Sequence, residues 1–417
     1  MRIAYVCSDR GIALDGHKGA AVHVREMARA FAELGHEVVI FTFRPGAAPA
    51  DLPARAVALE PDAADRALAR MVAEDPTLDE ALRWSLRSLI GASGFRHELR
   101  TALQAWSPDL IYERHALHGT AGATLARELQ VPHVLEVNAP LADEQERHRA
   151  LGLPGLTREL ERRTVQAADL VVAVSSAVSE WLVTQGVSSA RILTLPNAVD
   201  PRRFRAQPDA RASVRSELGL GDGPVIAFSG SLRPWHDLAS VVRAMTCDPL
   251  AQLHPRLLVV GDGPSRDDVA ALASRLGIAD SCRFVGAVPY AAVPSYLAAA
   301  DVAVAPYAAT GGLYFSPLKV FESMAAGLPV VSADGGDIRC CIVPGRTGYL
   351  YEAGDDRSLA WALGAALEER DMGRVGAAAR AHVLAHHTWQ RNAMRVLDAL
   401  ASAGDPARSA SLAGAVS

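Results

Sequence analysis

The sequence predicts an α/β protein made of two doubly wound parallel sheets, each flanked by helices. Short apolar runs alternate with helical patterns along all 417 residues, which is typical of parallel sheets covered on both faces. The length suits two domains of ordinary size, and half of the residues are hydrophobic, so each domain can bury a core. A polar, proline-bearing stretch, Pro196–Pro201, interrupts the alternation once. We therefore expect one doubly wound unit on each side of it.

In the first half, the first strand is followed by a long loop and a helix, Val22–Leu34, which Gly35 ends. Residues 46–107 are unusually helical and charged for a simple crossover. We interpret them as a helical insertion, which either shapes a pocket for a second substrate or covers the sheet. The strands that we expect in this half are Ile3–Cys7, Val38–Thr42, Leu110–Tyr112, His133–Val137, Leu170–Val174 and Arg191–Leu195.

The second half contains a short helix between a glycine-rich loop and a buried strand. Ser316 suits the N-cap position and Pro317 the first helical position. Gly327 suits the position that follows the last turn, and Pro329 prevents the helix from continuing. The strands that we expect here are Val225–Phe228, Leu257–Val260, Arg283–Val285, Val302–Ala305 and Val330–Ser332.

Composition excludes several classes of function. The net charge is −5, from 42 basic and 47 acidic residues, and gives no electrostatic case for nucleic-acid binding. Because the first residues read as a strand, we expect no signal peptide, and no apolar run in the sequence is long enough to span a membrane. The five cysteines lack metal-ligand spacing. We therefore expect a cytoplasmic protein with reduced thiols and no metal site.

Candidate binding residues lie in glycine-bearing loops that follow strands. The loop Gly11–Ala21 is too long for a dinucleotide fingerprint, although Gly19 allows close backbone approach to a ligand. The loop Gly230–Asp237 places Arg233 and His236 at the carboxyl edge of a sheet, where open α/β folds bind ligands. The alternative for the loop Gly230–Asp237 is a solvated loop without a ligand. The segment 261–264 contains a further candidate, Gly263, and its alternative is a simple turn.

Lys319 lies in the first turn of the helix that follows Ser316, where its charge opposes the helix dipole. A cation at this position is easier to explain if a phosphate group meets both the lysine and the helix N-terminus. Together with the glycine loops, Lys319 predicts a cleft between the two domains that binds a nucleotide diphosphate.

These segments, in this order and spacing, resemble the retaining glycosyltransferases of family 4, which have the GT-B fold. The resemblance runs from residue 1 to about residue 400. Its most specific part, residues 311–331, is similar to the family's E-x7-E segment and the G-x-P-V-V that follows it. Supporting parts are Gly19 through His36, Pro196–Asp200, Gly261–Pro264, and Gly286 followed by Ala300-Asp301.

The resemblance implies roles for five positions. Glu322 matches the glutamate that holds the ribose hydroxyls, and Leu318 and Lys319 match positions whose amides hold the diphosphate. Gly19 matches a glycine that approaches the donor phosphate from the N-terminal domain. Val288 matches a position that meets the base through its backbone.

The break near Pro196–Pro201 and the loss of periodicity from about Ser402 give the domain limits, and the resemblance implies that the last helix crosses back onto the first domain. We expect an N-terminal domain over 1–196, a donor-binding domain over 197–384, a helix over 385–404 that crosses back onto the first domain, and a disordered tail over 405–417.

The chain departs from the family pattern at three places. Tyr314 replaces the first glutamate of E-x7-E. Ser231 and His236 stand where a phosphate-binding Arg and Lys are usual, with Arg233 between them. Asn138 stands where a histidine near the transferred sugar is usual. We interpret these changes as coordinated, in an active subgroup.

The sequence thus predicts transfer of a sugar from a UDP- or GDP-linked donor to an acceptor hydroxyl, with retention and without a metal ion. The alternatives are a sugar-nucleotide epimerase or hydrolase, and a catalytically silent nucleotide-binding subunit. The predicted catalytic residues are Arg233, Lys319 and Asn138, and the predicted donor-binding residues are Gly19, Gly230, His236, Gly263, Val288, Tyr314, Ser316, Leu318 and Glu322.

The acceptor stays open between a small molecule, a glycan and a lipid-linked substrate. Two basic clusters, Arg147–Arg149 and Arg158–Arg163, are candidates for peripheral membrane contact. The alternative for both clusters is a solvated charged face.

Overall fold

The computed structural model describes residues 1–47, 51–205, 207–309, 314, 316–368 and 372–403. The chain forms two compact units. Unit 1 contains Met1–Pro196 and the chain from Gln390 onward, and unit 2 contains Asn197–Trp389. The first limit lies where the sequence places it, and the second lies five residues beyond the expected 384. The predicted tail, 405–417, lies outside the described residues.

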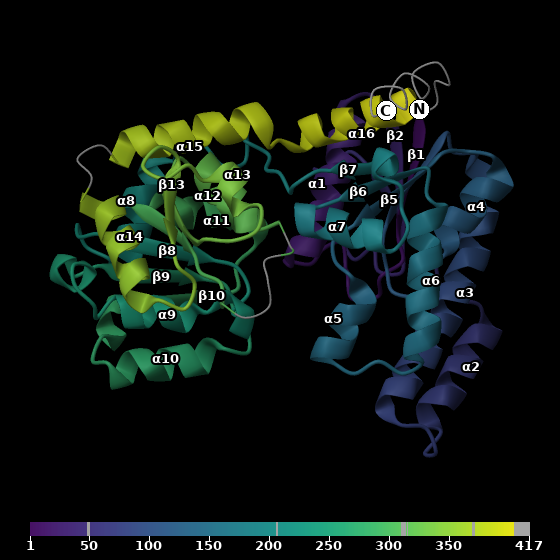
Figure 1. Cartoon of the computed structure of the whole chain (residues 1–417), viewed down its shortest axis with the longest axis horizontal. Helices are drawn as coiled ribbons and strands as arrows, with labels where there is room; N and C mark the ends of the chain where they lie inside the picture. The colour runs from purple at the N-terminus through teal and green to yellow at the C-terminus, as the bar shows by residue number, and fades with distance from the viewer. Residues whose placement is uncertain (48–50, 206, 310–313, 315, 369–371, 404–417) are drawn as a thin grey trace. The chain divides into compact units, whose positions relative to one another are not determined.

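Unit 1 is a seven-stranded parallel sheet with the order β3-β2-β1-β4-β5-β6-β7, covered by helices (Figure 1). The chain winds outward from β1 in one direction and from β4 in the other, as in a doubly wound fold. The strands are β1 Arg2–Cys7, β2 Glu37–Thr42, β3 Arg55–Ala58, β4 Leu110–Arg114, β5 His133–Val137, β6 Leu170–Ala173 and β7 Ile192–Thr194. The helices are α1 Gly19–Glu33, α2 Ala63–Glu74, α3 Glu80–Trp106, α4 Ala121–Leu129, α5 Leu141–His148, α6 Pro154–Ala167, α7 Ser176–Thr184 and α16 Trp389–Ala403.

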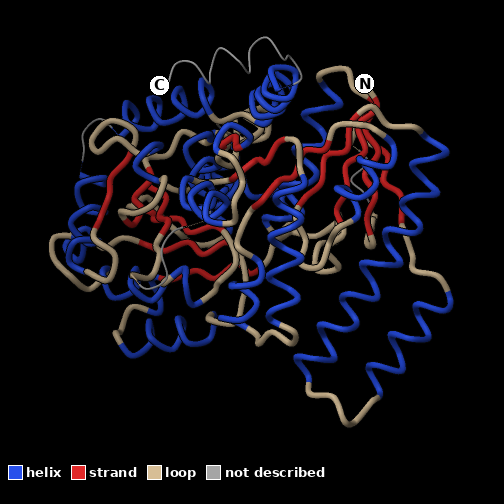
Figure 2. Tube along the Cα trace, turned by 45° about the vertical axis from the view of Figure 1, so that its right-hand side comes forward, coloured by secondary structure: helices blue, strands red, loops and turns tan. Residues whose placement is uncertain are grey.

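The region 46–107 is not wholly helical, so that prediction was partly wrong. It contains an edge strand, β3, which pairs in parallel with β2. Its sequence, Arg-Ala-Val-Ala, has a single β-branched residue, so the strand is defined by pairing with β2 rather than by propensity. The rest forms α2 and the 27-residue α3, which pack against each other as a hairpin (Figures 1 and 2).

Unit 2 is a six-stranded parallel sheet with the order β10-β9-β8-β11-β12-β13. Its winding reverses between β8 and β11. The strands are β8 Val225–Ser229, β9 Arg256–Val260, β10 Cys282–Gly286, β11 Val302–Ala305, β12 Val330–Ala333 and β13 Gly348–Tyr351. The helices are α8 Pro208–Glu217, α9 Leu238–Ala244, α10 Arg266–Arg275, α11 Val293–Ala298, α12 Leu318–Ala325, α13 Ile338–Cys341, α14 Asp356–Glu368 and α15 Met372–His386. The four-residue strand β13, which pairs with β12, was not predicted from the sequence.

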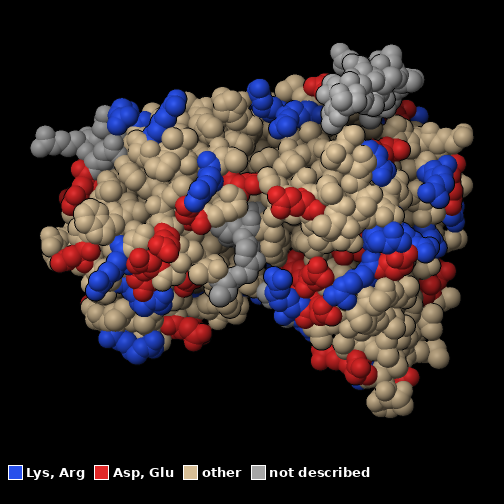
Figure 3. Space-filling model, in the orientation of Figure 1, with Lys and Arg blue, Asp and Glu red and all other residues tan. Residues whose placement is uncertain are grey.

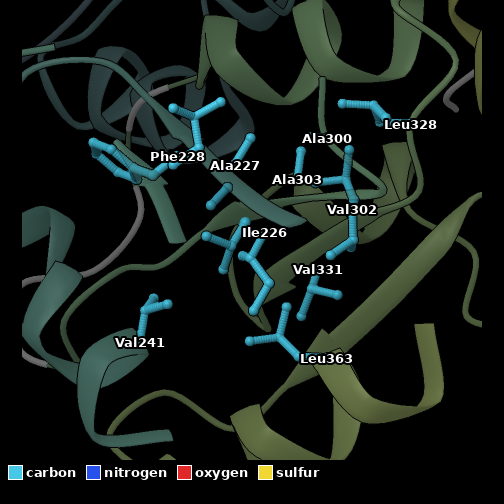
Figure 4. Close-up of a cluster of buried hydrophobic side chains, with 14 of the residues drawn as sticks. Ile226, Ala227, Phe228, Val241, Ala300, Val302, Ala303, Leu328, Val331 and Leu363 are labelled. Atoms are coloured by element: carbon cyan, nitrogen blue, oxygen red, sulfur yellow. The ribbon is translucent and has the colours of Figure 1, made fainter. Parts of the chain in front are cut away.

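The core of unit 2 surrounds the central strands. Ile226 and Phe228 of β8, Val302 of β11 and Val331 of β12 are almost completely buried, and Leu363 of α14 packs beside them (Figure 4). Parallel strands buried on both faces require such apolar runs. The two sheets therefore confirm the predicted α/β class, with two doubly wound units.

The helix that carries Lys319 starts one residue later than predicted. Pro317 is the N-cap residue, and α12 begins at Leu318. Ser316 does not cap α12, because its hydroxyl oxygen accepts a hydrogen bond from the backbone N–H of Asn197 at 2.8 Å. At the other end, Gly327 has φ +83° directly after the last turn, as a terminating glycine requires.

The chain passes between the units twice, near residues 196 and 389. In unit 1, Asn392 of α16 donates to the carbonyl of Pro196 at 2.8 Å, and Gln390 donates to Glu33 of α1 at 2.7 Å. In unit 2, the N–H of Val199 donates to the carbonyl of His387 at 3.0 Å. The two connecting segments are therefore hydrogen-bonded to each other within each unit.

Candidate functional site

The candidate site of unit 2 lies where the winding of its sheet reverses, at the carboxyl ends of β8 and β11. Open α/β sheets bind ligands at such a reversal, because the loops of the two strands diverge there. The loop after β8 begins at Gly230, and Tyr307 follows β11. The side chain of Lys319, from α12, reaches this position.

Lys319 is held by aromatic rings. Its Nζ lies 4.3 Å from the centroid of the Phe228 ring and 5.5 Å from that of Tyr307. The same atom is inaccessible to solvent and has no hydrogen-bond partner among the described residues. Burial lowers the pKa of Lys319 to about 7, although the nearby Glu322 carboxylate opposes the shift. A buried, unpartnered ammonium group is costly unless an anion meets it.

The loop after β8 adds two further basic side chains. The guanidinium carbon of Arg233 lies 5.7 Å from the centroid of the Trp235 ring, and Arg233 makes no ion pair within the described part of the chain. His236 donates a hydrogen bond through Nδ1 to the carbonyl oxygen of Ser231. Burial, and then the Lys319 charge, lower the pKa of His236 to about 3, so its ring is neutral near pH 7. His236 therefore adds no positive charge near pH 7, and the cations here are Arg233 and, below its pKa of about 7, Lys319.

The predicted glycines of this edge have mainly a packing explanation. A Cβ atom on Gly261 would overlap the carbonyl of Gly230, and one on Gly263 would overlap the backbone of Leu232. The N–H of Leu232 also donates to the carbonyl of Asp262 at 3.0 Å. Gly230 itself has φ +132°, and a Cβ there would lie 3.4 Å from Lys319 Nζ. Close backbone packing therefore accounts for Gly261 and Gly263, and Gly230 leaves room for the lysine.

The other predicted donor-binding residues of unit 2 are placed as follows. Leu318 and Lys319 are the first residues of α12, so their N–H groups lie in its first turn, where helices leave donors without an intrahelical partner. Glu322 is buried one turn further along. Val288 follows β10 and packs against the core. Tyr314 is half-buried, whereas Gly311 and Gly312 lie outside the described residues.

Asn197 is a residue that sequence reasoning missed. Besides its backbone bond to the Ser316 hydroxyl, its side-chain amide donates to the Ser316 carbonyl. Both groups are buried. Asn197 thus holds the segment that leads into α12, and its place in a proline-bearing linker gave no sign of this role.

In unit 1, Asn138 belongs to a buried charged cluster at the carboxyl ends of β4 and β5. Glu136, which is fully buried, accepts from Asn138 Nδ2 at 2.6 Å, Tyr112 Oη at 2.7 Å, Arg114 Nη1 at 2.5 Å and His23 Nε2 at 2.7 Å. Burial alone would raise the pKa of Glu136, but His23 and Arg114 hold it well below its usual range. The signal that could have found this cluster is a glutamate within the apolar run His133–Val137.

Gly19, the other predicted residue of unit 1, is the first residue of α1 and is exposed. No side chain caps α1, because the N-cap residue is Lys18. The structure therefore brings Gly230, Arg233, His236 and Lys319 together in unit 2, and Asn138 together with Glu136 in unit 1. The ligand-binding roles assigned to these residues remain predictions.

Of the two basic clusters considered for membrane contact, Arg158–Arg163 is paired with acids. Arg158 lies 2.6 Å from Glu146, and both Arg162 and Arg163 contact Glu159 at 2.8 Å and 2.6 Å. On the side of each unit that Figure 3 shows, basic and acidic side chains are intermingled. These pairs favour a solvated charged face. None of the helices in the described ranges is both long and apolar enough to cross a bilayer.

A metal centre was not expected from the sequence. Over the residues with a described position, no three His, Cys, Asp or Glu side chains are grouped so that they could hold a metal ion.

Comparison with known proteins gives two family matches. The family described as "Glycosyltransferase Family 4" matches residues 17–203, and the one described as "Glycosyl transferases group 1" matches residues 223–369. The first match lies in unit 1 apart from its last residues, and the second lies in unit 2.

Two relatives illustrate the similarity. The chain is 31% identical over 254 residues to a GDP-mannose-dependent alpha-(1-6)-phosphatidylinositol monomannoside mannosyltransferase of Mycolicibacterium smegmatis, covering 59% of this chain and 65% of the relative. It therefore spans just under two thirds of that enzyme's length. It is also 31% identical over 371 residues to D-inositol 3-phosphate glycosyltransferase 2 of Catenulispora acidiphila, covering 84% of this chain and 82% of the relative.

Among solved structures, HepE of Anabaena in complex with UDP has a TM-score of 0.71 with this chain. The superposition covers 96% of this chain and 100% of HepE, at 18% sequence identity. At that identity the likeness concerns the fold, and it agrees with two Rossmann-like domains of the GT-B type.

Proposed function

Because this chain belongs to glycosyltransferase family 4, we propose that it transfers a sugar from a nucleotide-diphosphate sugar to an acceptor hydroxyl, with retention at the anomeric carbon. The observation that carries the proposal is the position of Lys319. Its ammonium group is buried, lacks a hydrogen-bond partner among the described residues and lies at the reversal point of a doubly wound sheet. A diphosphate is the kind of ligand that would compensate this charge.

In the proposed reaction, the bond between the anomeric carbon and the diphosphate oxygen breaks as the acceptor oxygen attacks from the same face. The departing phosphate oxygen takes the proton of the acceptor hydroxyl, so the charges balance without an added base. The protein's part is to position both substrates and to stabilise the negative charge of the leaving diphosphate. Lys319, Arg233 and the first N–H groups of α12 would supply that stabilisation.

Metal independence is part of the proposal, because the cations Lys319 and Arg233 are available for the charge that Mg²⁺ would otherwise neutralise. We include a cytoplasmic location as well, since all five cysteines are free thiols, which suits a reducing compartment. Activity that survives EDTA and is not increased by Mg²⁺ or Mn²⁺ would support the first point. A strict requirement for either ion would contradict it.

The donor base is proposed to be uridine or guanosine. The name of the mycobacterial relative specifies GDP-mannose, and HepE was crystallised with UDP. Thermal unfolding of the full chain with UDP, GDP and then their sugars would decide between the two. A ligand at 100 times its Kd adds about 2.7 kcal/mol to stability, which is a readily measured shift. If neither UDP nor GDP raises the unfolding temperature, the proposed donor is wrong.

The reaction class has its own test. The chosen donor is incubated with the full chain, first alone and then with a panel of acceptor alcohols, and the release of nucleotide and the anomeric configuration of the product are measured. Release that requires an acceptor, with a retained configuration, supports the proposal. Rapid release or epimerisation of donor alone would favour a hydrolase or epimerase, and binding without transfer would favour a silent nucleotide-binding subunit.

A further inference from the structure

One face of α3 lies over the loops that follow β1, β2 and β4 in unit 1. Trp84, Arg87, Ser88, Gly91 and Phe95 are spaced three or four residues apart, so they share this face, which we call the α3 face. Phe95 packs against Phe43, which follows β2, with ring centroids 4.7 Å apart. The α3 face is thus fixed to the carboxyl edge of the sheet.

Arg10, in the loop after β1, is seated between that edge and the α3 face. Its guanidinium carbon lies 4.6 Å from the centroid of the Phe43 ring. Its guanidinium also lies so close to Gly91 that a Cβ there would come within 2.5 Å of Nη2. The glycine and the ring therefore define where this guanidinium lies, although the residue as a whole is exposed.

The charged group that acts on Arg10 is another arginine. Burial, and then the guanidinium of Arg87, lower the pKa of Arg10. Neither arginine forms an ion pair with a described carboxylate. The two acids of the β1–α1 loop bond to the backbone instead: Asp9 accepts from the N–H of Gly11 at 2.7 Å, and Asp15 accepts from that of Ala47 at 3.3 Å.

Arg100 provides the contrast on the same helix. It forms a two-point pair with Glu128, with N···O distances of 2.7 and 2.8 Å. Arg100 is thus paired with a carboxylate, whereas the charges of Arg10 and Arg87 act on each other at the edge where doubly wound sheets bind ligands.

We propose that Arg10 and Arg87 bind a phosphate group of the acceptor substrate. This inference rests on the proposed function, because it assigns the acceptor to unit 1. Two guanidinium groups match a phosphate in both charge and geometry, since each can donate two parallel hydrogen bonds to its oxygens. The exposed ring of Trp84, on the same face, offers an apolar surface beside the phosphate.

Binding of a phosphomonoester tests the proposal without relying on transfer. Glycerol 1-phosphate is titrated into the full chain by calorimetry, with uncharged glycerol as the reference. Every protein in the series carries Lys319→Ala, which disables the proposed donor-phosphate contact. The variants Arg10→Gln and Arg87→Gln each remove one guanidinium, and Arg100→Gln removes a paired arginine of the same helix. Gly91→Ala leaves all charges in place but puts a methyl group where the Arg10 guanidinium lies.

We expect saturable binding of glycerol 1-phosphate that weakens at least about tenfold in Arg10→Gln, in Arg87→Gln and in Gly91→Ala, because each disturbs a charge-assisted contact. Arg100→Gln should bind as its parent does. Loss of saturable binding in the parent, or equal affinity in all variants, overturns the proposal. Circular dichroism of each variant checks that it is folded, so that weaker binding is not caused by unfolding. Alanine has a higher helix propensity than glycine, so Gly91→Ala should not disrupt α3.

A second arm identifies the source of the phosphate. Sedimentation with phosphatidylcholine vesicles that contain phosphatidic acid, compared with phosphatidylcholine alone, is measured for the same variants. Sedimentation that depends on Arg10 and Arg87 assigns the phosphate to a lipid headgroup, and binding of glycerol 1-phosphate alone assigns it to a soluble acceptor. The change in unfolding temperature that UDP or GDP causes is measured separately, in chains with an intact Lys319, and reports on the donor site alone. Failure of the proposed donor is therefore distinguishable from failure of this phosphate subsite.

Discussion

The ammonium nitrogen of Lys319 lies 4.3 Å from the centroid of the Phe228 ring, at the end of the strand where the sheet of unit 2 reverses its winding. The ring faces the cation and attracts it through its quadrupole, but it cannot replace the hydrogen bonds that an ammonium group has in water. The charge of Lys319 is thus positioned by an apolar surface and left available to a ligand.

The first prediction concerns pH. The pKa of Lys319 is lowered to about 7 by burial, so the free enzyme loses this cation as the pH rises above that value. We expect kcat/KM to fall about tenfold per pH unit above the pKa, because kcat/KM reports on groups of the free enzyme. In Lys319→Arg the guanidinium stays charged, so the alkaline decline should vanish whatever the rate. An unchanged alkaline limb in that variant would assign the decline to another group.

The second prediction concerns the charge of the leaving diphosphate. Removal of one charge-stabilising group typically costs about 10²–10³-fold in rate. We expect Lys319→Ala and Arg233→Ala each to lower kcat by at least about tenfold for the same reason. Arg275→Ala, at an exposed position of α10, is the matched control and should retain its activity. Steady-state rates near those of the unmodified protein for Lys319→Ala or Arg233→Ala would remove them from the site.

The third prediction concerns Glu322, which is buried one turn beyond Lys319 in α12. If its carboxylate contacts the donor ribose, Glu322→Gln should raise the donor KM more than it lowers kcat. Because the Glu322 charge raises the pKa of Lys319, the variant should also begin its alkaline decline at a lower pH. If the alkaline decline begins at a lower pH but the donor affinity is unchanged, Glu322 acts only through Lys319.

The fourth prediction concerns Ser316. Its hydroxyl accepts from the buried N–H of Asn197, so Ser316→Ala leaves that donor unsatisfied. Such a loss costs about 1–3 kcal/mol and should lower the urea midpoint. We also expect a weaker donor affinity, because the segment leading into α12 loses its anchor. Ser274→Ala, whose exposed hydroxyl bonds to a carbonyl of its own helix, is the control that should change neither quantity.

The fifth prediction concerns the buried Glu136. Its pKa is lower in the folded protein than in the unfolded chain, so its stabilising contribution is present above the unfolded value, 4.5, and is lost as the pH falls below it. Glu136→Gln should destabilise unit 1 by about 3–5 kcal/mol at pH 7, because Arg114 stays buried without its partner. The free energy of unfolding is measured by denaturant for Glu136→Gln and for the double variant Glu136→Gln/Arg114→Met. The double variant should recover part of the stability that the single variant loses.

The strands of both sheets were largely predictable because their patterns are local. Runs such as Val225–Phe228 and Val330–Ser332 are continuously apolar, as buried parallel strands must be. The edge strands β3 and β13 were missed, because pairing with a neighbour defines them more than propensity does.

The site was predictable only in part. A lysine in the first turn of a helix was a local anomaly, and it led to Lys319. The aromatic surface beside Lys319 is formed by Phe228 of β8 and Tyr307 after β11. Ser316 is held by a hydrogen bond to Asn197, which lies 119 residues away along the chain. These contacts are set by the topology of the sheet, so no local pattern shows them. The facing of the two units across a common cleft stays a prediction.

The hydrogen bond between Asn392 and Pro196 has a practical consequence for dissecting the protein. Unit 2 is one uninterrupted stretch of chain, whereas unit 1 is assembled from both ends of it. A stop codon after residue 389 would therefore leave unit 2 covalently complete and strip α16 from unit 1. Conversely, deleting 197–389 brings together two ends that are already hydrogen-bonded neighbours, so a short glycine bridge should close unit 1. Each half of the proposed chemistry could then be expressed and titrated with its own substrate.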